Sequence, residues 1–124
     1  MKFEFDNNIP IYIQLVEQLK IAIISGKIEL GERLPSVRDL AFQTKVNPNT
    51  MQKALVELEN LKLIYTERTN GKFVTNDKNL IDFYRKENAN LLARNYILSM
   101  ENIGFTKLEA IEYLKKGGDS RWSC

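Results

Sequence analysis

The 124-residue sequence predicts a mainly α-helical (α+β) fold with a single β-hairpin. Helix-start signals recur at Ser36 and Asn47, which are residue types that cap helix N-termini. The pair Asn70-Gly71 then marks a hairpin, because both residues tolerate the positive φ of a tight turn. Two helices that meet at a turn and are followed by a hairpin form a winged helix-turn-helix. A change of composition after Asp77 predicts a separate helical region beyond it.

The first helix is expected to begin near Pro10, since proline lacks the N–H that would be unpaired at the first helical position. Its apolar residues recur at helical spacing and form one stripe: Tyr12, Leu15, Val16, Leu19, Ala22 and Ile23. Gly26 is well placed to end this helix in the left-handed conformation. The connector that follows is expected to turn three apolar residues inward: Ile28, Leu30 and Leu34.

The second and third helices each open with a capping residue. Ser36 caps the second helix, and Asp39 three residues later gives an approximate capping box. Asn47 caps the third helix and is followed by Pro48 at the first helical position. The residues expected to face inward are Val37, Leu40 and Ala41 in the second helix and Met51, Ala54, Leu55, Leu58 and Leu61 in the third.

The hairpin is expected to pair residues 63–67 with residues 72–75 across a two-residue turn at Asn70-Gly71. Arg68 and Lys72 flank this turn, so the tip of the hairpin carries positive charge.

Two helices are expected after the hairpin. The first runs from residue 78 to about residue 102 and is interrupted by Gly104. Thr106 and Glu109 have the spacing of a capping box and open the second helix. Gly117-Gly118 are expected to end it.

These two C-terminal helices are too small to enclose a ligand cavity and leave an apolar stripe that needs a partner surface. A second copy of the chain is the simplest partner, and a slot for a cofactor is the alternative. Stripes at helical spacing are more often core or interface, so we expect these dimerisation residues: Leu80, Phe83, Tyr84, Leu91, Ile97, Leu98, Leu108 and Ile111. The predicted organisation is a winged helix-turn-helix domain (1–77), a helical dimerisation region (78–118) and a flexible tail (119–124).

The composition, 44% hydrophobic and 27% charged, is that of a soluble globular protein. No apolar run approaches the roughly 18 residues of a membrane span, and residues 1–6 lack the apolar core of a signal peptide. A single cysteine, Cys124, indicates a reducing cytoplasm. The chain has no histidine and so lacks the commonest general base and metal ligand, which argues against an enzyme; no metal or cofactor is predicted.

Winged helix-turn-helix domains often bind DNA through a polar helix face and an adjacent basic loop. The net charge of +2 counts against this function, so a DNA-facing surface would have to be basic locally. The candidate DNA-binding residues are Ser36, Arg38, Asn47, Asn49, Thr50, Gln52, Lys53, Arg68, Gly71 and Lys72.

Arg38 is the sharpest candidate, because a guanidinium can read a guanine edge or clamp a phosphate. Its alternative role is a surface ion pair with a nearby acid such as Asp39. Asn47, Asn49 and Thr50 crowd a helix N-terminus, where short polar groups and free N–H groups bind phosphate or merely cap the helix.

Gln52 can read adenine and Lys53 can meet phosphate, although an ordinary solvated helix face has the same composition. Arg68, Gly71 and Lys72 suit a backbone or minor-groove contact, although a hairpin tip tolerates glycine and charge whatever its function.

Several motifs then occur in order: PIYIQL at 10–15, LPSVRDLA at 34–41, VNPNT at 46–50 and ALVELE at 54–59. With Gly26 and Gly31 between them, they resemble the GntR family of bacterial transcription regulators. The short two-helix ending, with Gly104-Phe105-Thr106 and then Glu109, resembles the YtrA subfamily.

The resemblance implies a cytoplasmic homodimer that represses a nearby operon, often one encoding a transporter, from an inverted-repeat operator. The family's DNA-contacting positions correspond to Arg38, Asn47, Asn49, Thr50 and Gly71.

The chain also departs from the family pattern. Many relatives have a basic residue at the positions of Pro48 and Gln52, and a glycine at the position of Lys62. The hairpin lacks a second glycine and a basic residue that are often found there. A winged helix that assembles with proteins and does not bind DNA is the main rival interpretation, and near-neutral charge is its best support. No membrane partner is predicted, and whether a small-molecule effector binds is left open.

Overall fold

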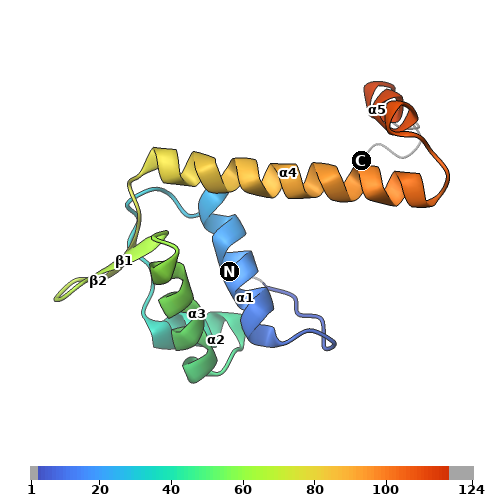
Figure 1. Ribbon diagram of the computed structural model, residues 1–124. Coiled ribbons are helices and arrows are strands. Elements are labelled where there is room, and N and C mark those ends of the chain that lie inside the picture. Colours follow the sequence, from blue (N-terminus) through green and yellow to red (C-terminus); the bar gives the residue numbers. More distant parts are fainter. Residues whose placement is uncertain (1–2, 118–124) are drawn as a thin grey trace. The chain divides into compact units, whose positions relative to one another are not determined.

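The computed structural model describes residues 3–117 (Figure 1). Its elements are α1 (Ile11–Ile24), α2 (Val37–Thr44), α3 (Pro48–Asn60), β1 (Ile64–Glu67), β2 (Gly71–Val74), α4 (Lys78–Asn102) and α5 (Lys107–Lys115). The predicted fold class, a mainly α-helical chain with one hairpin, is confirmed. The predicted tail at 119–124 and Gly118 lie outside the described residues.

The chain divides into two compact units between Arg85 and Lys86, which we call the N-terminal and C-terminal units. The predicted boundary after residue 77 coincides with the start of α4, where the Asp77 side chain accepts a hydrogen bond from the Leu80 N–H at 3.2 Å. The N-terminal unit nevertheless extends to Arg85, because Ile81 is buried in its hydrophobic core.

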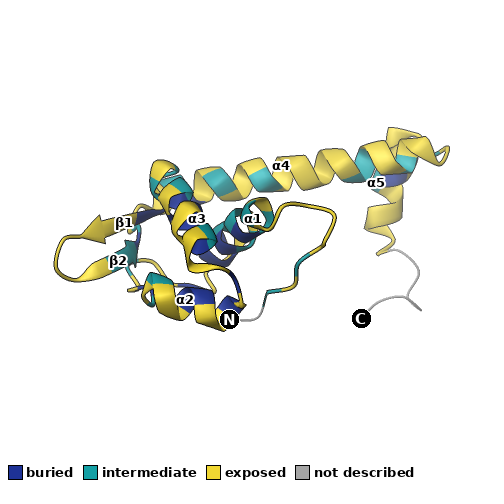
Figure 2. Ribbon diagram, turned by 90° about the horizontal axis from the view of Figure 1, so that it is seen from below, coloured by how far each residue is buried: buried dark blue, intermediate teal, exposed yellow. Residues whose placement is uncertain are grey.

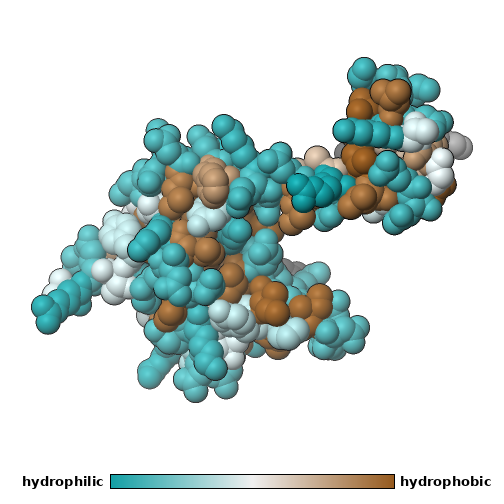
Figure 3. All heavy atoms as spheres, viewed as in Figure 1, coloured by the Kyte–Doolittle hydropathy of each residue, from teal (hydrophilic) through white to brown (hydrophobic). Residues whose placement is uncertain are grey.

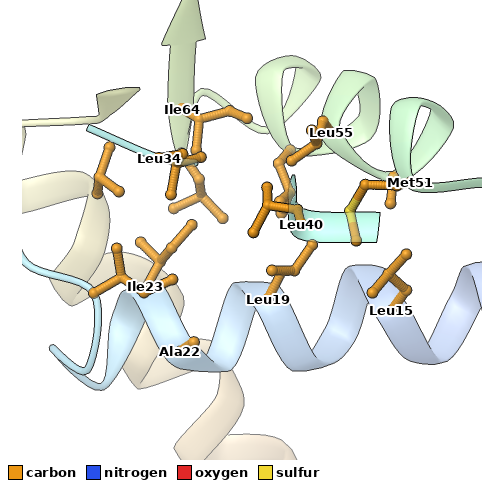
Figure 4. Close-up of a cluster of buried hydrophobic side chains, with 14 of the residues drawn as sticks. Leu15, Leu19, Ala22, Ile23, Leu34, Leu40, Met51, Leu55 and Ile64 are labelled. Carbon is orange, nitrogen blue, oxygen red and sulfur yellow. The ribbon is translucent and has the colours of Figure 1, made fainter. Parts of the chain in front are cut away.

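The core of the N-terminal unit fixes the positions of its three helices and of the hairpin. α3 contacts α1, α2 and β1, so it lies at the centre of the unit. Figure 4 shows side chains of α1 directed toward those of α2, α3 and β1, and the labelled residues are Leu15, Leu19, Ala22, Ile23, Leu34, Leu40, Met51, Leu55 and Ile64. This packing leaves the polar sides of α2 and α3 exposed (Figure 2).

Two details around α1 differ from expectation. Helix α1 begins at Ile11 and Pro10 is its N-cap, whereas Pro10 was predicted at the first helical position. Leu30 is 37% exposed, so its predicted burial is wrong. Its neighbours are held inward by backbone hydrogen bonds, from Ile28 N–H to Ala22 O and from Leu34 N–H to Lys72 O, and Leu30 lies at the turn between them. Gly26, with φ +85°, follows α1 in the left-handed conformation, as predicted.

α2 and α3 end at lysines in the left-handed conformation. Lys45 has φ 58° and Lys62 has φ 66°. In each case the next residue donates to a carbonyl five residues back, from Val46 N–H to Ala41 O and from Leu63 N–H to Leu58 O, both at 3.0 Å. These bonds satisfy carbonyls at the helix end and turn the chain sharply.

The hairpin pairs Ile64 with Val74 and Glu67 with Gly71, so three residues, Arg68 to Asn70, join the strands. The predicted two-residue turn is therefore wrong. Of the pair Asn70-Gly71, only Gly71 has a positive φ, of 97°. Asn70 instead binds back to Glu67, through its N–H to the carbonyl and through its side-chain amide to the carboxylate at 3.0 Å. These local bonds hold Asn70 outside the left-handed region.

The C-terminal unit consists of the later turns of α4 and the whole of α5. Gly104 has φ +101° and follows the end of α4. Thr106 and Glu109 form the predicted capping box, with bonds of 3.1 Å and 3.0 Å. The Tyr96 hydroxyl donates to the Ala110 carbonyl at 2.8 Å and joins α4 to α5. Among the described residues of this unit, only Ala110 is buried, so the unit has little core of its own.

Candidate nucleic-acid interface

Ser36 and Asn47 both act as helix caps. The Ser36 hydroxyl accepts a hydrogen bond from the Asp39 N–H at 3.1 Å, and the Asn47 side-chain oxygen accepts one from the Asn49 N–H at 2.8 Å. No reciprocal bond from the Ser36 N–H to Asp39 occurs among the described residues, so the predicted capping box at α2 is only half formed. Because an Asp side chain is one methylene shorter than Glu, it reaches back less far. The Ser36 hydroxyl hydrogen and the Asn47 amide hydrogens remain available as donors to DNA.

The polar face of α3 begins at its first turn. Asn49, Gln52 and Lys53 are exposed and lie together at i, i+3 and i+4 spacing, while Thr50 is half-buried beside them. The opposite face is anchored by fully buried Met51 and by its neighbours in the core. The core packing therefore fixes which α3 side chains reach solvent.

Arg38 is exposed near the start of α2. The alternative role considered for it, an ion pair with Asp39, is not among the ion pairs of residues 3–117. Arg68 at the hairpin loop and Lys53 on α3 are likewise outside those ion pairs. Although the net charge is only +2, the predicted DNA-facing elements carry three exposed cations, Arg38, Lys53 and Arg68.

Lys72 is placed differently from the other candidates. Its ammonium lies 2.6 Å from the Glu59 carboxylate and 2.9 Å from the Thr66 hydroxyl, and its side chain is only 17% exposed. Thr66 also donates to the same Glu59 oxygen, at 2.5 Å. The hydrogen bond from Lys72 is the main cause that holds the pKa of Glu59 below its ordinary value. Lys72 therefore binds two side chains of its own chain, Glu59 and Thr66.

Two exposed residues near this surface were not anticipated from the sequence. Arg33 forms an isolated β-bridge with Phe73. Its guanidinium lies beside Gly71: a Cβ added to Gly71 would be 3.5 Å from the Arg33 Nε. Phe42 is 84% exposed on α2, one turn after Arg38. The sequence signal for Arg33 was its position directly before the LPSVRDLA motif; an exposed Phe42 had no signal, since aromatic residues usually indicate core.

The comparison with known families decides the identity of this fold. The profile described as "Bacterial regulatory proteins, gntR family" matches residues 11–74, from the start of α1 to the end of β2. The chain belongs to the GntR family. It is therefore a transcription regulator with a winged helix-turn-helix DNA-binding domain, as the motifs predicted, and its family is one of regulators rather than enzymes.

Two Bacillus subtilis relatives match different shares of the chain. The "Uncharacterized HTH-type transcriptional regulator YhcF" of Bacillus subtilis is 33% identical over 115 residues, which is 93% of this chain and 95% of YhcF. The "HTH-type transcriptional repressor YtrA" of the same organism is 42% identical over 66 residues, which is 53% of this chain and 51% of YtrA. The predicted YtrA-like character of this GntR regulator is thus confirmed.

Solved structures agree with the fold. A GntR family transcriptional regulator from Listeria monocytogenes has a TM-score of 0.83 and 41% identity, over 90% of this chain and 98% of that one. The DNA-binding domain of AraR, solved in complex with operator ORX1, has a TM-score of 0.54 and 26% identity, over 60% of this chain and 95% of that one.

The described residues hold no helix long and apolar enough to cross a membrane. Within residues 3–117 there is also no group of three or more potential metal ligands.

Proposed function

We propose that this GntR-family chain acts in the cytoplasm as a homodimeric repressor of a nearby operon, such as one encoding a transporter, and binds an inverted-repeat operator. The observation that carries the proposal is the exposed polar start of α3, held in place by the buried side of the same helix. The operator complex of the AraR domain and the name of YtrA as a repressor support it. The function requires no cofactor and no membrane.

In this proposal each subunit inserts the N-terminal end of α3 into the major groove. Arg38 reads a base or clamps a phosphate, and Asn49 and Thr50 orient α3 on the backbone. Gln52 reads a base and Lys53 meets phosphate. Ser36 and Asn47 add hydrogen bonds from the donors that capping leaves free. At the hairpin, Arg68 and Gly71 approach the backbone or the minor groove.

In this proposal the dimer contacts lie mostly on the C-terminal unit, and Leu80 and Phe83 on the first turns of α4 belong to the N-terminal unit. The C-terminal unit exposes apolar side chains on α4 and on α5, where Leu108 is 76% exposed, and Figure 3 shows hydrophobic surface over the end of α4 and α5. Exposed apolar patches of this kind mark interaction surfaces. The proposed contacts are Leu80, Phe83, Leu91, Ile97, Leu98, Leu108 and Ile111.

Tyr84 was also predicted at the interface, and in the structure it packs against the core of the N-terminal unit. Its hydroxyl donates to the Leu61 carbonyl at 2.9 Å, and the Lys20 ammonium lies 4.9 Å from its ring centroid. We therefore assign Tyr84 to the packing of the N-terminal unit.

The test is selection of binding sites from a random-sequence duplex pool by the full-length protein, followed by titration of the recovered duplex at several salt concentrations. We expect an inverted repeat, a complex with two chains, and affinity that falls with salt. The Arg38→Ala variant should bind more weakly, by about tenfold. Failure to enrich any duplex would favour the rival, a winged helix that binds only proteins.

A further inference from the structure

We propose that Glu59, Thr66 and Lys72 form a wing lock, which holds the β-hairpin in one orientation against α3. Lys72 then supports DNA binding as a positioning residue and not by touching DNA. The inference rests on the proposed DNA-binding function and deepens it, because it assigns separate roles to the two basic side chains of the hairpin, Arg68 and Lys72.

The three side chains come from three elements. Glu59 lies in the last turn of α3, Thr66 on β1 and Lys72 on β2. Thr66 and Lys72 are directly paired across the hairpin. Both donate to the same oxygen of Glu59, at 2.5 Å and 2.6 Å, and Lys72 also donates to Thr66 at 2.9 Å. One carboxylate thus ties both strands to α3.

The base of the hairpin is already fixed, because Ile64 and Val74 are buried in the core and the Leu34 N–H donates to the Lys72 carbonyl. The strands are only four residues each, so few residues lie between this base and the exposed loop. Tyr65 stacks on Phe73 at 5.7 Å between ring centroids, but this contact joins the strands to each other and not to α3. The loop that carries Arg68 is exposed along its length. Thr66 and Lys72 lie between the base and this loop, so their contacts with Glu59 bear on the direction in which the loop points relative to α3.

The wing lock is less exposed than an ordinary surface ion pair. Lys72 is largely shielded from solvent and Glu59 is partly so, which reduces screening by salt. Two of the three donors of the Lys72 ammonium are used within the lock. The lowered pKa of Glu59 agrees with a carboxylate that is held in its charged form.

A direct phosphate contact by Lys72 makes the opposite prediction. If Lys72 binds DNA and Glu59 only masks it, then Glu59→Gln frees a cation and removes an anion near DNA, so binding tightens. If the wing lock positions the hairpin, Glu59→Gln weakens binding although the net charge becomes more positive. The sign of the change separates the two roles.

The experiment titrates the full-length protein with the duplex recovered by selection and with a scrambled duplex of equal length. We expect Glu59→Gln and Lys72→Met each to weaken binding to the selected duplex by about fivefold, and the double variant to bind no worse than either. The matched control is Glu57→Gln, which removes the same charge from the same helix. Glu57 is outside the ion pairs of residues 3–117, and this control should show no loss.

A charge swap and a DNA-free measurement complete the test. Glu59→Lys combined with Lys72→Glu rebuilds the pair in reverse and should recover most of the binding that each single reversal loses. Amide hydrogen exchange of residues 68–71 without DNA should quicken in Glu59→Gln and not in Glu57→Gln. Tighter binding by Glu59→Gln, additive losses in the double variant, or unchanged exchange overturns the wing lock. Failure of the selection to enrich any duplex instead overturns the proposed function.

Discussion

The Asn49 N–H donates to the Asn47 side chain at 2.8 Å, so the residue that ends the turn after α2 also fixes the first turn of α3. Asn47 is exposed and can bind DNA at the same time. Its two roles are separable by chemistry, because aspartate caps a helix as well as asparagine does but repels phosphate.

We therefore expect Asn47→Ala to lower the free energy of unfolding by about 1 kcal/mol. Asn47→Asp should keep the stability of the wild type while weakening DNA binding. Urea unfolding and titration with the selected duplex measure the two effects. An aspartate variant that binds as tightly as the wild type would restrict Asn47 to capping.

Local signals of this kind were legible in the sequence because they involve residues within a few positions of each other. The cap at Asn47 and the capping box of Thr106 and Glu109 were both predicted and are both present. The same holds for the helical stripes that form the core, since periodicity determines which side of a helix is buried.

The contacts of Lys72 could not be predicted from the sequence, because its partner Glu59 is 13 residues away and meets it only after the hairpin folds onto α3. The same reason applies to Arg33 beside Gly71. The two-residue turn predicted at Asn70-Gly71 was wrong for a different reason. Asparagine tolerates a positive φ, but the bonds of Asn70 to Glu67 favour a longer turn.

Lys62 has a left-handed backbone, with φ 66°, although it is not a glycine. A residue with a Cβ is strained there by about 1–2 kcal/mol, and glycine loses part of that gain through its freer unfolded chain. Lys62→Gly should therefore stabilise the protein by up to about 1 kcal/mol. Urea unfolding measures it. Glu17→Gly, at an exposed position inside α1, is the control and should destabilise by about 1 kcal/mol.

Tyr84 offers a test of its assignment to the N-terminal unit. Tyr84→Phe removes the hydrogen bond to the Leu61 carbonyl and should cost about 1 kcal/mol of stability. Because this hydrogen bond lies within the N-terminal unit, the proposed dimer should be unaffected in sedimentation at micromolar concentrations. Dissociation of the dimer without loss of unfolding free energy would return Tyr84 to the subunit interface.

The wing lock also predicts a pH dependence. A carboxyl group whose pKa is lowered on folding stabilises the native state above its unfolded pKa, and this contribution is lost as the pH falls through the folded pKa. The stability difference between the wild type and Glu59→Gln should be full above the ordinary glutamate pKa of about 4.3 and shrink below it. Urea unfolding from neutral to acidic pH measures it. A difference that does not change over this range would exclude a native role for the charged form.

The predicted dimer face distinguishes two neighbouring leucines of α4. Leu91 is 51% exposed and belongs to the predicted apolar stripe, whereas Leu92 is 66% exposed and lies about 100° further round the helix. Neither side chain is buried within its own unit, so replacing either with aspartate should alter the fold of the monomer little. Leu91→Asp should place a charge in the proposed interface and shift the protein toward monomers, since a buried unpaired charge is costly.

Leu92→Asp is the matched control, with the same charge on the same turn, and should remain dimeric. Light scattering coupled to gel filtration gives the mass of each variant, and titration with the selected duplex gives its affinity. If, as proposed, a symmetric dimer binds two half-sites, the monomeric variant should lose affinity for the inverted repeat far more than for a single half-site. Monomers from Leu92→Asp and dimers from Leu91→Asp would move the interface to the other face of α4.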